Sequence, residues 1–328
     1  MHVETWLWWA TVLVTTAVLL FDVFIIGRRP HTPTMKESGR YLAFYIGLAV
    51  AFGLWVWWRY GGQYGGEFFA GWLTEYSLSI DNLFIFIIIM TKLGVPRKYQ
   101  QTALLIGIVI ALVMRGAFIA VGAAAIANFS WIFYLFGAFL IFTAVKLASE
   151  GDEPEGGYDE PRIVRFVQQH FPVSKEWNGV SLTIKENGKR LLTPMFVVVL
   201  SLGMTDLLFA LDSIPAIYGL TSEPYLVFTA NVFALMGLRQ LYFLIGDLLK
   251  RLVYLSYGLA FLLFFIGVKL VLEAMHENEL PFINGGEHIE WAPEIPIWLS
   301  LVVIVGTLAV TAVASLAKDR SDAKKSDA

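Results

Sequence analysis

Four acidic residues lie within long apolar stretches of the sequence, where charged side chains are rare. Glu75 and Asp81 are six residues apart in one stretch, and Asp206 and Asp212 repeat that spacing in another. A charge costs about 2.5–3.5 kcal/mol at the centre of a bilayer, so four carboxylates cost on the order of 10 kcal/mol there. Ionisable residues inside a membrane mark ion pathways, and carboxylate oxygens suit hard divalent cations such as Mg²⁺, Ca²⁺ and Mn²⁺.

Neutral oxygen atoms accompany these carboxylates. Asn82 directly follows Asp81, and Ser213 follows Asp212 at the matching position. Asn231, in a third apolar stretch, is either a further ligand or a hydrogen-bonding group between helices. The predicted metal site therefore consists of Glu75, Asp81, Asp206, Asp212, Asn82 and Ser213, with Asn231 as an additional candidate.

The residue types that the sequence lacks exclude other chemistry. There is no cysteine, which excludes disulfides and thiolate metal sites, and there are only five histidines. Signatures of membrane enzymes such as His-Glu-x-x-His or Gly-x-Ser-x-Gly do not occur. We therefore expect no catalysis and no prosthetic group, and a metal ion that is carried rather than resident.

Two arginines in apolar stretches, Arg115 and Arg239, are expected to supply supporting positive charge. They could instead neutralise two of the carboxylates as buried ion pairs that hold a helix bundle together, a purely structural interpretation. Residues six apart on a straight helix point about 240° apart, so convergence of the carboxylates on one ion requires local unwinding. Gly203 and Pro215 favour such unwinding, because proline frees a backbone carbonyl.

The composition indicates an all-α polytopic membrane protein. Of the 328 residues, 57% are hydrophobic and 16% are charged, whereas soluble domains have about 45–50% and about 25%. Stretches of about 20 apolar residues match a hydrocarbon core of roughly 30 Å. We predict nine transmembrane helices, at 5–26, 41–58, 67–90, 101–124, 130–148, 193–218, 225–247, 252–272 and 296–316.

Charges in the connections predict the orientation. Lysine and arginine gather after the first, third, seventh and ninth spans, whereas segment 273–295 has six glutamates and no lysine or arginine. Basic short loops mark the cytoplasmic side. We therefore expect an inner (plasma) membrane protein with the N-terminus outside and the C-terminus in the cytoplasm. The net charge of -3 gives no reason to expect a nucleic-acid partner, so the expected partners are lipid and a divalent metal ion.

Spans three to five resemble spans six to eight. The paired carboxylates match in the first helix of each triplet, Arg115 matches Arg239 in the second, and Lys146 matches Lys269 in the third. Three is an odd number, so the second triplet enters the membrane from the opposite side, as in many secondary transporters. The predicted parts are two peripheral spans (1–66), the first triplet (67–150), a cytoplasmic loop (151–192), the second triplet (193–273), and an acidic outer loop with the last span and a cytoplasmic tail (274–328).

Three smaller features are interpreted structurally. Lys146 and Lys269 lie near span ends and are expected to extend to the membrane interface. In the long loop, residues 163–171 predict a short amphipathic helix. Further on, Asn187-Gly188 predicts the turn of a β-hairpin.

The acidic segments resemble a known family. EYSLSIDN from Glu75 to Asn82 and TDLLFALDSIPA from Thr205 to Ala216 are similar to the two hallmark segments of the TerC family of integral membrane proteins. The nine-span layout is similar to that of its Alx-type members. The family is named after tellurium resistance. The resemblance implies export of Mn²⁺ from the cytoplasm, with the acidic positions of the family carried by Glu75, Asp81, Asp206 and Asp212.

Three functions remain open from the sequence. The first is a secondary transporter that exports a divalent cation, Mn²⁺ by resemblance, with protons as a candidate for exchange. The second is a transporter of Ca²⁺ or another divalent cation through the same site. The third is a non-transporting membrane scaffold or stress-resistance protein, in which the buried charges are structural.

Overall fold

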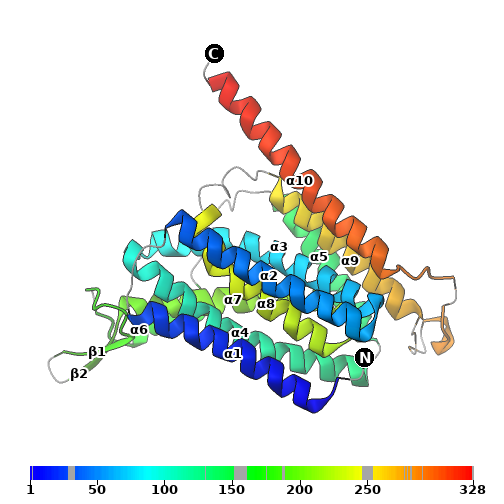
Figure 1. Ribbon diagram of the computed structural model, residues 1–328, viewed down its shortest axis with the longest axis horizontal. Coiled ribbons are helices and arrows are strands. Elements are labelled where there is room, and N and C mark those ends of the chain that lie inside the picture. Colours follow the sequence, from blue (N-terminus) through cyan, green and yellow to red (C-terminus); the bar gives the residue numbers. More distant parts are fainter. Residues whose placement is uncertain are drawn as a thin grey trace.

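The computed structural model describes residues 1, 3–28, 34–129, 131–150, 161–174, 176–186, 189–245, 254–276, 278, 280, 283–289 and 291–326. Long helices dominate it (Figure 1). They are α1 (Thr5–Arg28), α2 (Met35–Tyr60), α3 (Gly62–Lys92), α4 (Arg97–Asn128), α5 (Ile132–Glu150), α6 (Arg162–His170), α7 (Pro194–Tyr218), α8 (Pro224–Ile245), α9 (Leu255–His276) and α10 (Ile297–Ser326). The strands are β1 (Thr183–Glu186) and β2 (Lys189–Leu192), and Asn284–Gly286 forms one 3₁₀ turn.

Eight helices within the described residues are long and apolar enough to cross a membrane. They are α2 to α5 and α7 to α10, which correspond to the second to ninth predicted spans. The first predicted span is helix α1, whose described apolar part, Thr5–Val18, is shorter. Several helices extend beyond their predicted limits, because backbone hydrogen bonding continues past the apolar stretch; α2, for example, begins at Met35. The prediction of an all-α polytopic membrane protein is confirmed.

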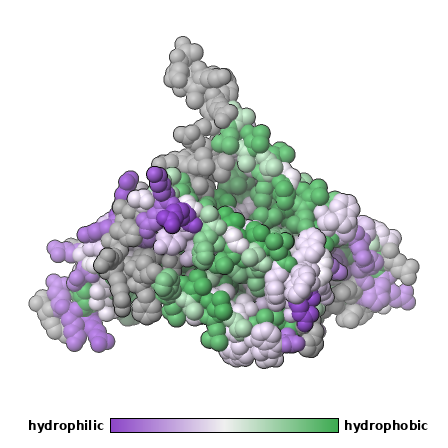
Figure 2. All heavy atoms as spheres, in the orientation of Figure 1, coloured by the Kyte–Doolittle hydropathy of each residue, from purple (hydrophilic) through white to green (hydrophobic). Residues whose placement is uncertain are grey.

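The surface fits a protein embedded in lipid. Figure 2 shows hydrophobic residues across the middle of the molecule, with hydrophilic residues gathered at its two ends. Exposed tryptophans lie at the start of α1 (Trp6), at the end of α2 (Trp58) and at the start of α10 (Trp298). Tryptophan is enriched where a membrane meets water, so these residues form part of an aromatic belt at one interface.

The helices of the two predicted triplets pack in matching pairs. Helix α3, the first of its triplet, packs on α8, the second of the other triplet. In the same way α7, the first of its triplet, packs on α4, the second of the other. The first helices run antiparallel: a Cβ on Gly71, early in α3, would lie 3.2 Å from Ile217 near the end of α7. Further along α3, Asn82 lines the same cavity as Phe209 in the middle of α7. This packing is what an inverted repeat would produce, and the repeat itself stays a prediction.

The third helices of the triplets, α5 and α9, have the most extensive helix contact in the described chain. At their crossing, a Cβ on Gly137 would lie 2.7 Å from the Gly267 carbonyl oxygen, and a Cβ on Gly267 would lie 3.0 Å from the Gly137 carbonyl oxygen. Glycine is therefore required at both positions for the backbones to approach closely, as small residues allow in membrane bundles.

The predicted unwinding of the sixth span is wrong. Helix α7 is continuous from Pro194 to Tyr218, with Pro215 inside it, and α3 is continuous as well. Gly203 serves packing instead, because a Cβ there would lie 3.2 Å from Ile110 of α4. Pro215 has no N–H, so the carbonyl of Leu211 loses its usual helical donor while the helix carries on.

The long loop contains the two elements predicted from the sequence. Helix α6 is the predicted amphipathic segment, with Val164 buried and Phe166 exposed. Strands β1 and β2 pair antiparallel, and Glu186 lies opposite Lys189. This register places the turn at Asn187-Gly188, which themselves lie outside the described residues.

Candidate cation site

Arg115 of α4 is buried inside the bundle, where its side chain is 1% exposed. Its Nε donates to Asp206 Oδ2 at 2.9 Å and its Nη2 donates to Asp206 Oδ1 at 3.1 Å, a two-pronged contact with α7. Its Nη1 donates to Glu75 of α3, to Ser213 Oγ at 3.2 Å and to Asn231 Oδ1 at 2.9 Å. We call Arg115, Glu75, Asp206, Ser213 and Asn231 the Arg115 cluster.

The charges of the Arg115 cluster do not balance if both carboxylates are ionised, because one guanidinium faces two carboxylates. Glu75 is fully buried, and its Oε1 also accepts a hydrogen bond from Ser79 at 3.3 Å. Its other oxygen, Oε2, is buried without a hydrogen-bond partner among the described residues. An unpaired buried carboxylate oxygen is costly and often marks a site for water or an ion.

Asp212 lies apart from the Arg115 cluster, on another side of α7. It lines a cavity of about 270 Å³ together with Asn82, Thr143 and Lys146. Thr143 Oγ1 donates to Asp212 Oδ1 at 3.2 Å. We call this space the Asp212 cavity. Lys146 therefore lines a cavity beside a carboxylate, in addition to lying near a helix end as the sequence suggested.

The structure thus divides the predicted site into two parts. Glu75, Asp206, Ser213 and Asn231 meet at Arg115, whereas Asp212 and Asn82 share the Asp212 cavity. Asp81 belongs to α3, but its side chain lies outside the described part of the chain. No three Asp, Glu, His or Cys side chains of the described residues are close enough together to hold a metal ion in this conformation.

Arg239, which was also predicted to supply supporting charge, lies outside the Arg115 cluster as defined above. It is buried on α8, eight residues beyond Asn231, which is about 12 Å along a helix. Its guanidinium donates to the side-chain oxygen of Gln240 at 2.6 Å, once that amide is oriented to satisfy both groups. Among the contacts of the described residues, Arg115 therefore donates to carboxylates and Arg239 to an amide oxygen.

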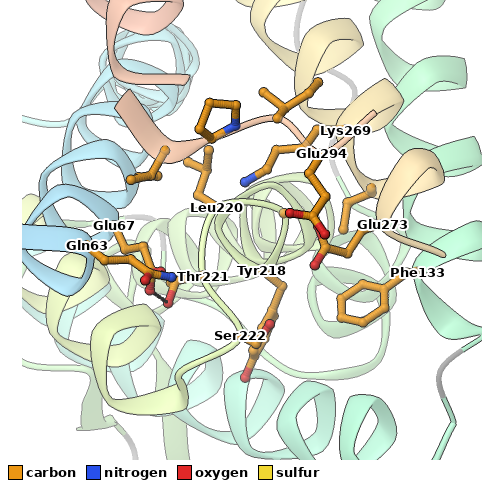
Figure 3. Close-up of a pocket in the computed structure, with 15 residues that line it drawn as sticks. Gln63, Glu67, Phe133, Tyr218, Leu220, Thr221, Ser222, Lys269, Glu273 and Glu294 are labelled. Atoms are coloured by element: carbon orange, nitrogen blue, oxygen red, sulfur yellow. Dashed lines mark hydrogen bonds between the residues drawn. The ribbon is translucent and has the colours of Figure 1, made fainter. Parts of the chain in front are cut away.

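A larger polar cavity, of about 670 Å³, was missed from the sequence (Figure 3). It lies between the start of α3 and the ends of α7 and α9, and Glu67, Lys269, Glu273 and Glu294 line it. We call it the Lys269 cavity. Lys269 is only 9% exposed, so the expectation that it extends to the membrane interface is wrong. The relevant signal was a group of glutamates at the ends of separate predicted spans. Charged residues at span ends are normally expected to face the membrane–water interface, so a shared cavity was not predicted.

The two cavities lie at opposite ends of one interface formed by α3, α5, α7 and α9. Along α3, Glu67 in one cavity and Asn82 in the other are fifteen residues apart, or about 22 Å. Glu75 of the Arg115 cluster lies roughly midway between them. Measured along α3, the buried Arg115 cluster therefore lies at a depth between the two cavities, and it faces α4 and α8 instead of α5 and α9.

Comparison with known proteins identifies the family. Residues 60–323 match the family described as "Integral membrane protein TerC family". The chain belongs to the TerC family. Both hallmark segments lie within the match, and so do the Arg115 cluster and both cavities. No solved structure matches this TerC-family chain.

Relatives of this TerC-family chain align over nearly its whole length. "Uncharacterized membrane protein Rv2723" of Mycobacterium tuberculosis (strain ATCC 25618 / H37Rv) is 45% identical over 320 residues, 97% of this chain and 80% of the relative. "Uncharacterized membrane protein STKORF319" of Myxococcus xanthus is 37% identical over 317 residues, 96% and 93% of the two chains. "Putative membrane-bound redox modulator Alx" of Escherichia coli (strain K12) is 34% identical over 315 residues, 93% and 92% of the two chains.

Proposed function

We propose that this TerC-family protein is a secondary transporter that exports a divalent metal cation, Mn²⁺, from the cytoplasm. The observation that carries the proposal is the occurrence of polar groups at successive depths along α3, in two cavities and, at a depth between them, in the buried carboxylates of the Arg115 cluster. Ionisable groups so deep in a membrane protein are typical of ion pathways. Export of Mn²⁺ is also what the resemblance of the acidic segments implies.

Asp212 and Asn82 are the proposed first ligands of the ion. Both line the Asp212 cavity, and the hydroxyl oxygen of Thr143 lies beside them. The Leu211 carbonyl, which Pro215 deprives of its helical donor, adjoins Asp212. Carboxylate, amide, hydroxyl and carbonyl oxygens suit Mn²⁺ and also Ca²⁺, so this ligand set supports either ion.

Competition between metal ions and protons for the site tests which ion is carried and whether its transport is coupled to protons. We expect the empty site to hold protons on its carboxylates. Because the ion binds only the ionised form, Mn²⁺ addition to the solubilised protein is expected to release these protons into a weak buffer. Protons compete for the same oxygens, so Mn²⁺ affinity falls as the pH drops from about 8 to about 5.5. Competition by Ca²⁺, Mg²⁺ and Zn²⁺ ranks the ions. Stronger binding of Ca²⁺ than Mn²⁺ favours the calcium alternative, and binding without proton release points to another coupling ion or to none.

The proposed location is the inner (plasma) membrane, with the N-terminus outside and α6 in the cytoplasm. Basic connections support this orientation, which places the Lys269 cavity outside and the Asp212 cavity inside. Because the chain has no cysteine, single cysteines report the orientation cleanly. An impermeant maleimide is expected to label Glu287→Cys in intact cells and Ser149→Cys only after permeabilisation. The reverse pattern would overturn both the orientation and the direction of transport. Gly285 is avoided because its φ of 68° strains a side chain.

One observation favours the alternative of a non-transporting protein. Arg115 alone pairs with Glu75 and Asp206, so two of the four predicted carboxylates already have a structural partner. The name of the Escherichia coli relative suggests a redox role. The 328 residues contain no cysteine, so a thiol couple within them is excluded. Asp212 has no such arginine partner among the described residues, which is why the transport proposal depends on it.

A further inference from the structure

The Lys269 cavity contains a buried carboxylate that is held by neutral donors. Glu67 is 8% exposed, and its Oε2 accepts a hydrogen bond from Thr221 Oγ1 at 2.6 Å. Its Oε1 accepts a hydrogen bond from Gln63 Nε2 at 3.1 Å. These donors fix the carboxylate in place without neutralising its charge. Gly219 makes the arrangement possible: a Cβ there would lie 2.6 Å from Ile266, so only glycine lets the segment before Thr221 pass this close to α9.

Lys269 is the basic side chain in this cavity, and it is also buried. Figure 3 shows its ammonium directed into the space between Glu67 and Glu294. No hydrogen bond or salt bridge joins it to any described residue, although three glutamates line the same cavity. A buried ammonium and a buried carboxylate thus share one cavity without forming a contact pair, and the lining carries more negative than positive charge.

We propose that the Lys269 cavity binds a hydrated divalent cation, and that Lys269 is a tethered cation that competes with this ion for the glutamates. The proposal rests on the proposed cation transport and adds a second site to it, on the proposed outer side. In this site, Glu67 is the deep anchor. Glu273 and Glu294 lie nearer the opening, where Glu294 also contacts His276 at 3.4 Å.

The dimensions of the cavity fit a hydrated ion better than a bare one. The glutamates are too dispersed to ligate a metal directly in this conformation. Six waters occupy about 180 Å³ at about 30 Å³ each, whereas the cavity volume is about 670 Å³. An ion can therefore keep its water shell in this cavity. This favours hydrated binding, because small divalent cations such as Mg²⁺ lose their water shell reluctantly. Weak binding through water suits a site from which an ion leaves.

The matching lysines of the triplets support this role for Lys269. Lys146 and Lys269 occupy equivalent positions in the predicted repeat, and each lines a cavity that also contains a carboxylate, at opposite ends of the same interface. In the Lys269 cavity, the ammonium lowers the affinity for a second cation and so shortens the time for which the ion stays. Removal of this charge must then strengthen binding, whereas a lysine that only stabilises the fold would give no gain.

Paramagnetic Mn²⁺ tests the site directly. A nitroxide on Ser222→Cys, at the cavity lining, is expected to show saturable relaxation enhancement as Mn²⁺ is added to the solubilised protein. Two substitutions are then made in the labelled protein. Glu67→Gln is expected to weaken the Mn²⁺ affinity about tenfold, and Lys269→Met is expected to strengthen it about tenfold; each change corresponds to about 1.4 kcal/mol. Lys269→Gln repeats the gain with a polar side chain. The unchanged spectrum before Mn²⁺ addition verifies folding in each variant.

The controls separate this proposal from the transport proposal. Lys318→Met removes an exposed lysine at the other end of the molecule and is expected to leave the Mn²⁺ affinity at the Ser222 label unchanged. No saturable effect at this label in any variant, together with normal Mn²⁺ transport in vesicles, would overturn the cavity site and leave the transport proposal intact. A saturable effect without transport would support the site and overturn the transport proposal. Unchanged or weaker affinity in both Lys269 variants would overturn the competing role of the lysine.

Discussion

Replacement of Arg115 by methionine is expected to prevent the bundle from folding stably. The guanidinium joins α4 to α3, α7 and α8 through buried hydrogen bonds, two of them to Asp206 at 2.9 and 3.1 Å. Without it, Glu75 and Asp206 are both left buried without a cation. Breaking a buried ion pair by removing one partner costs about 3–5 kcal/mol, which is a large part of the stability of a typical domain. Little folded Arg115→Met protein is therefore expected after size-exclusion chromatography in mild detergent.

Removal of the two carboxylate charges that Arg115 contacts should restore the stability of this variant. In Arg115→Met combined with Glu75→Gln and Asp206→Asn, no buried carboxylate is left in the Arg115 cluster, so most of the lost stability returns. The midpoint of thermal unfolding measures the effect. Arg59→Met, at an exposed position near the end of α2, is the matched control and should leave the midpoint unchanged. A wild-type midpoint for Arg115→Met would show that the ion pairs contribute nothing to the fold.

Replacement of Asp212 by asparagine is expected to abolish Mn²⁺ export without unfolding the protein. Asparagine keeps the size of the side chain and can still accept the hydrogen bond from Thr143. It lacks the negative charge that attracts the ion. Transport should fall at least about 100-fold, equivalent to about 2.7 kcal/mol, while the unfolding midpoint stays close to wild type. Asp81→Asn, at the matching position of the first triplet, is expected to behave in the same way.

Two further variants make the Asp212 result interpretable. Asp206→Asn removes a carboxylate that pairs with Arg115 and should lower stability as well as transport. Glu176→Gln removes a charge from the exposed loop and should change neither. Wild-type transport by Asp212→Asn would remove this residue from the ion path.

Hydropathy was sufficient to predict the helices, because a membrane span must be apolar over a fixed length. The hairpin could be predicted from Asn187-Gly188, because the preference of Asn-Gly for tight hairpin turns depends only on the local sequence. The limits of α2 and α3 were set too narrowly, because their first turns are polar and apolar length does not report where helical hydrogen bonding starts. Local and compositional signals therefore predicted the elements but not their ends.

The partners of the charged residues could not be predicted in the same way. Spacing along α3 and α7 placed the carboxylates on their helices, but which of them meets an arginine depends on how four helices cross. The structural alternative paired two arginines with two carboxylates, whereas Arg115 alone contacts both Glu75 and Asp206. The Lys269 cavity was missed for a related reason. Its groups come from the ends of separate helices, and a sequence does not show that those ends form one cavity.

Transport of Mn²⁺ into inside-out membrane vesicles tests the central claim most directly. In such vesicles an exporter moves the ion inward, so vesicles with the wild-type protein are expected to accumulate Mn²⁺ above protein-free vesicles. Accumulation should increase when the vesicle interior is more acidic than the medium, because protons then leave as the metal enters. Vesicles with folded Asp212→Asn should match protein-free vesicles. Equal Mn²⁺ content in wild-type, Asp212→Asn and protein-free vesicles, with or without the proton gradient, would contradict transport and leave a structural role for the buried charges.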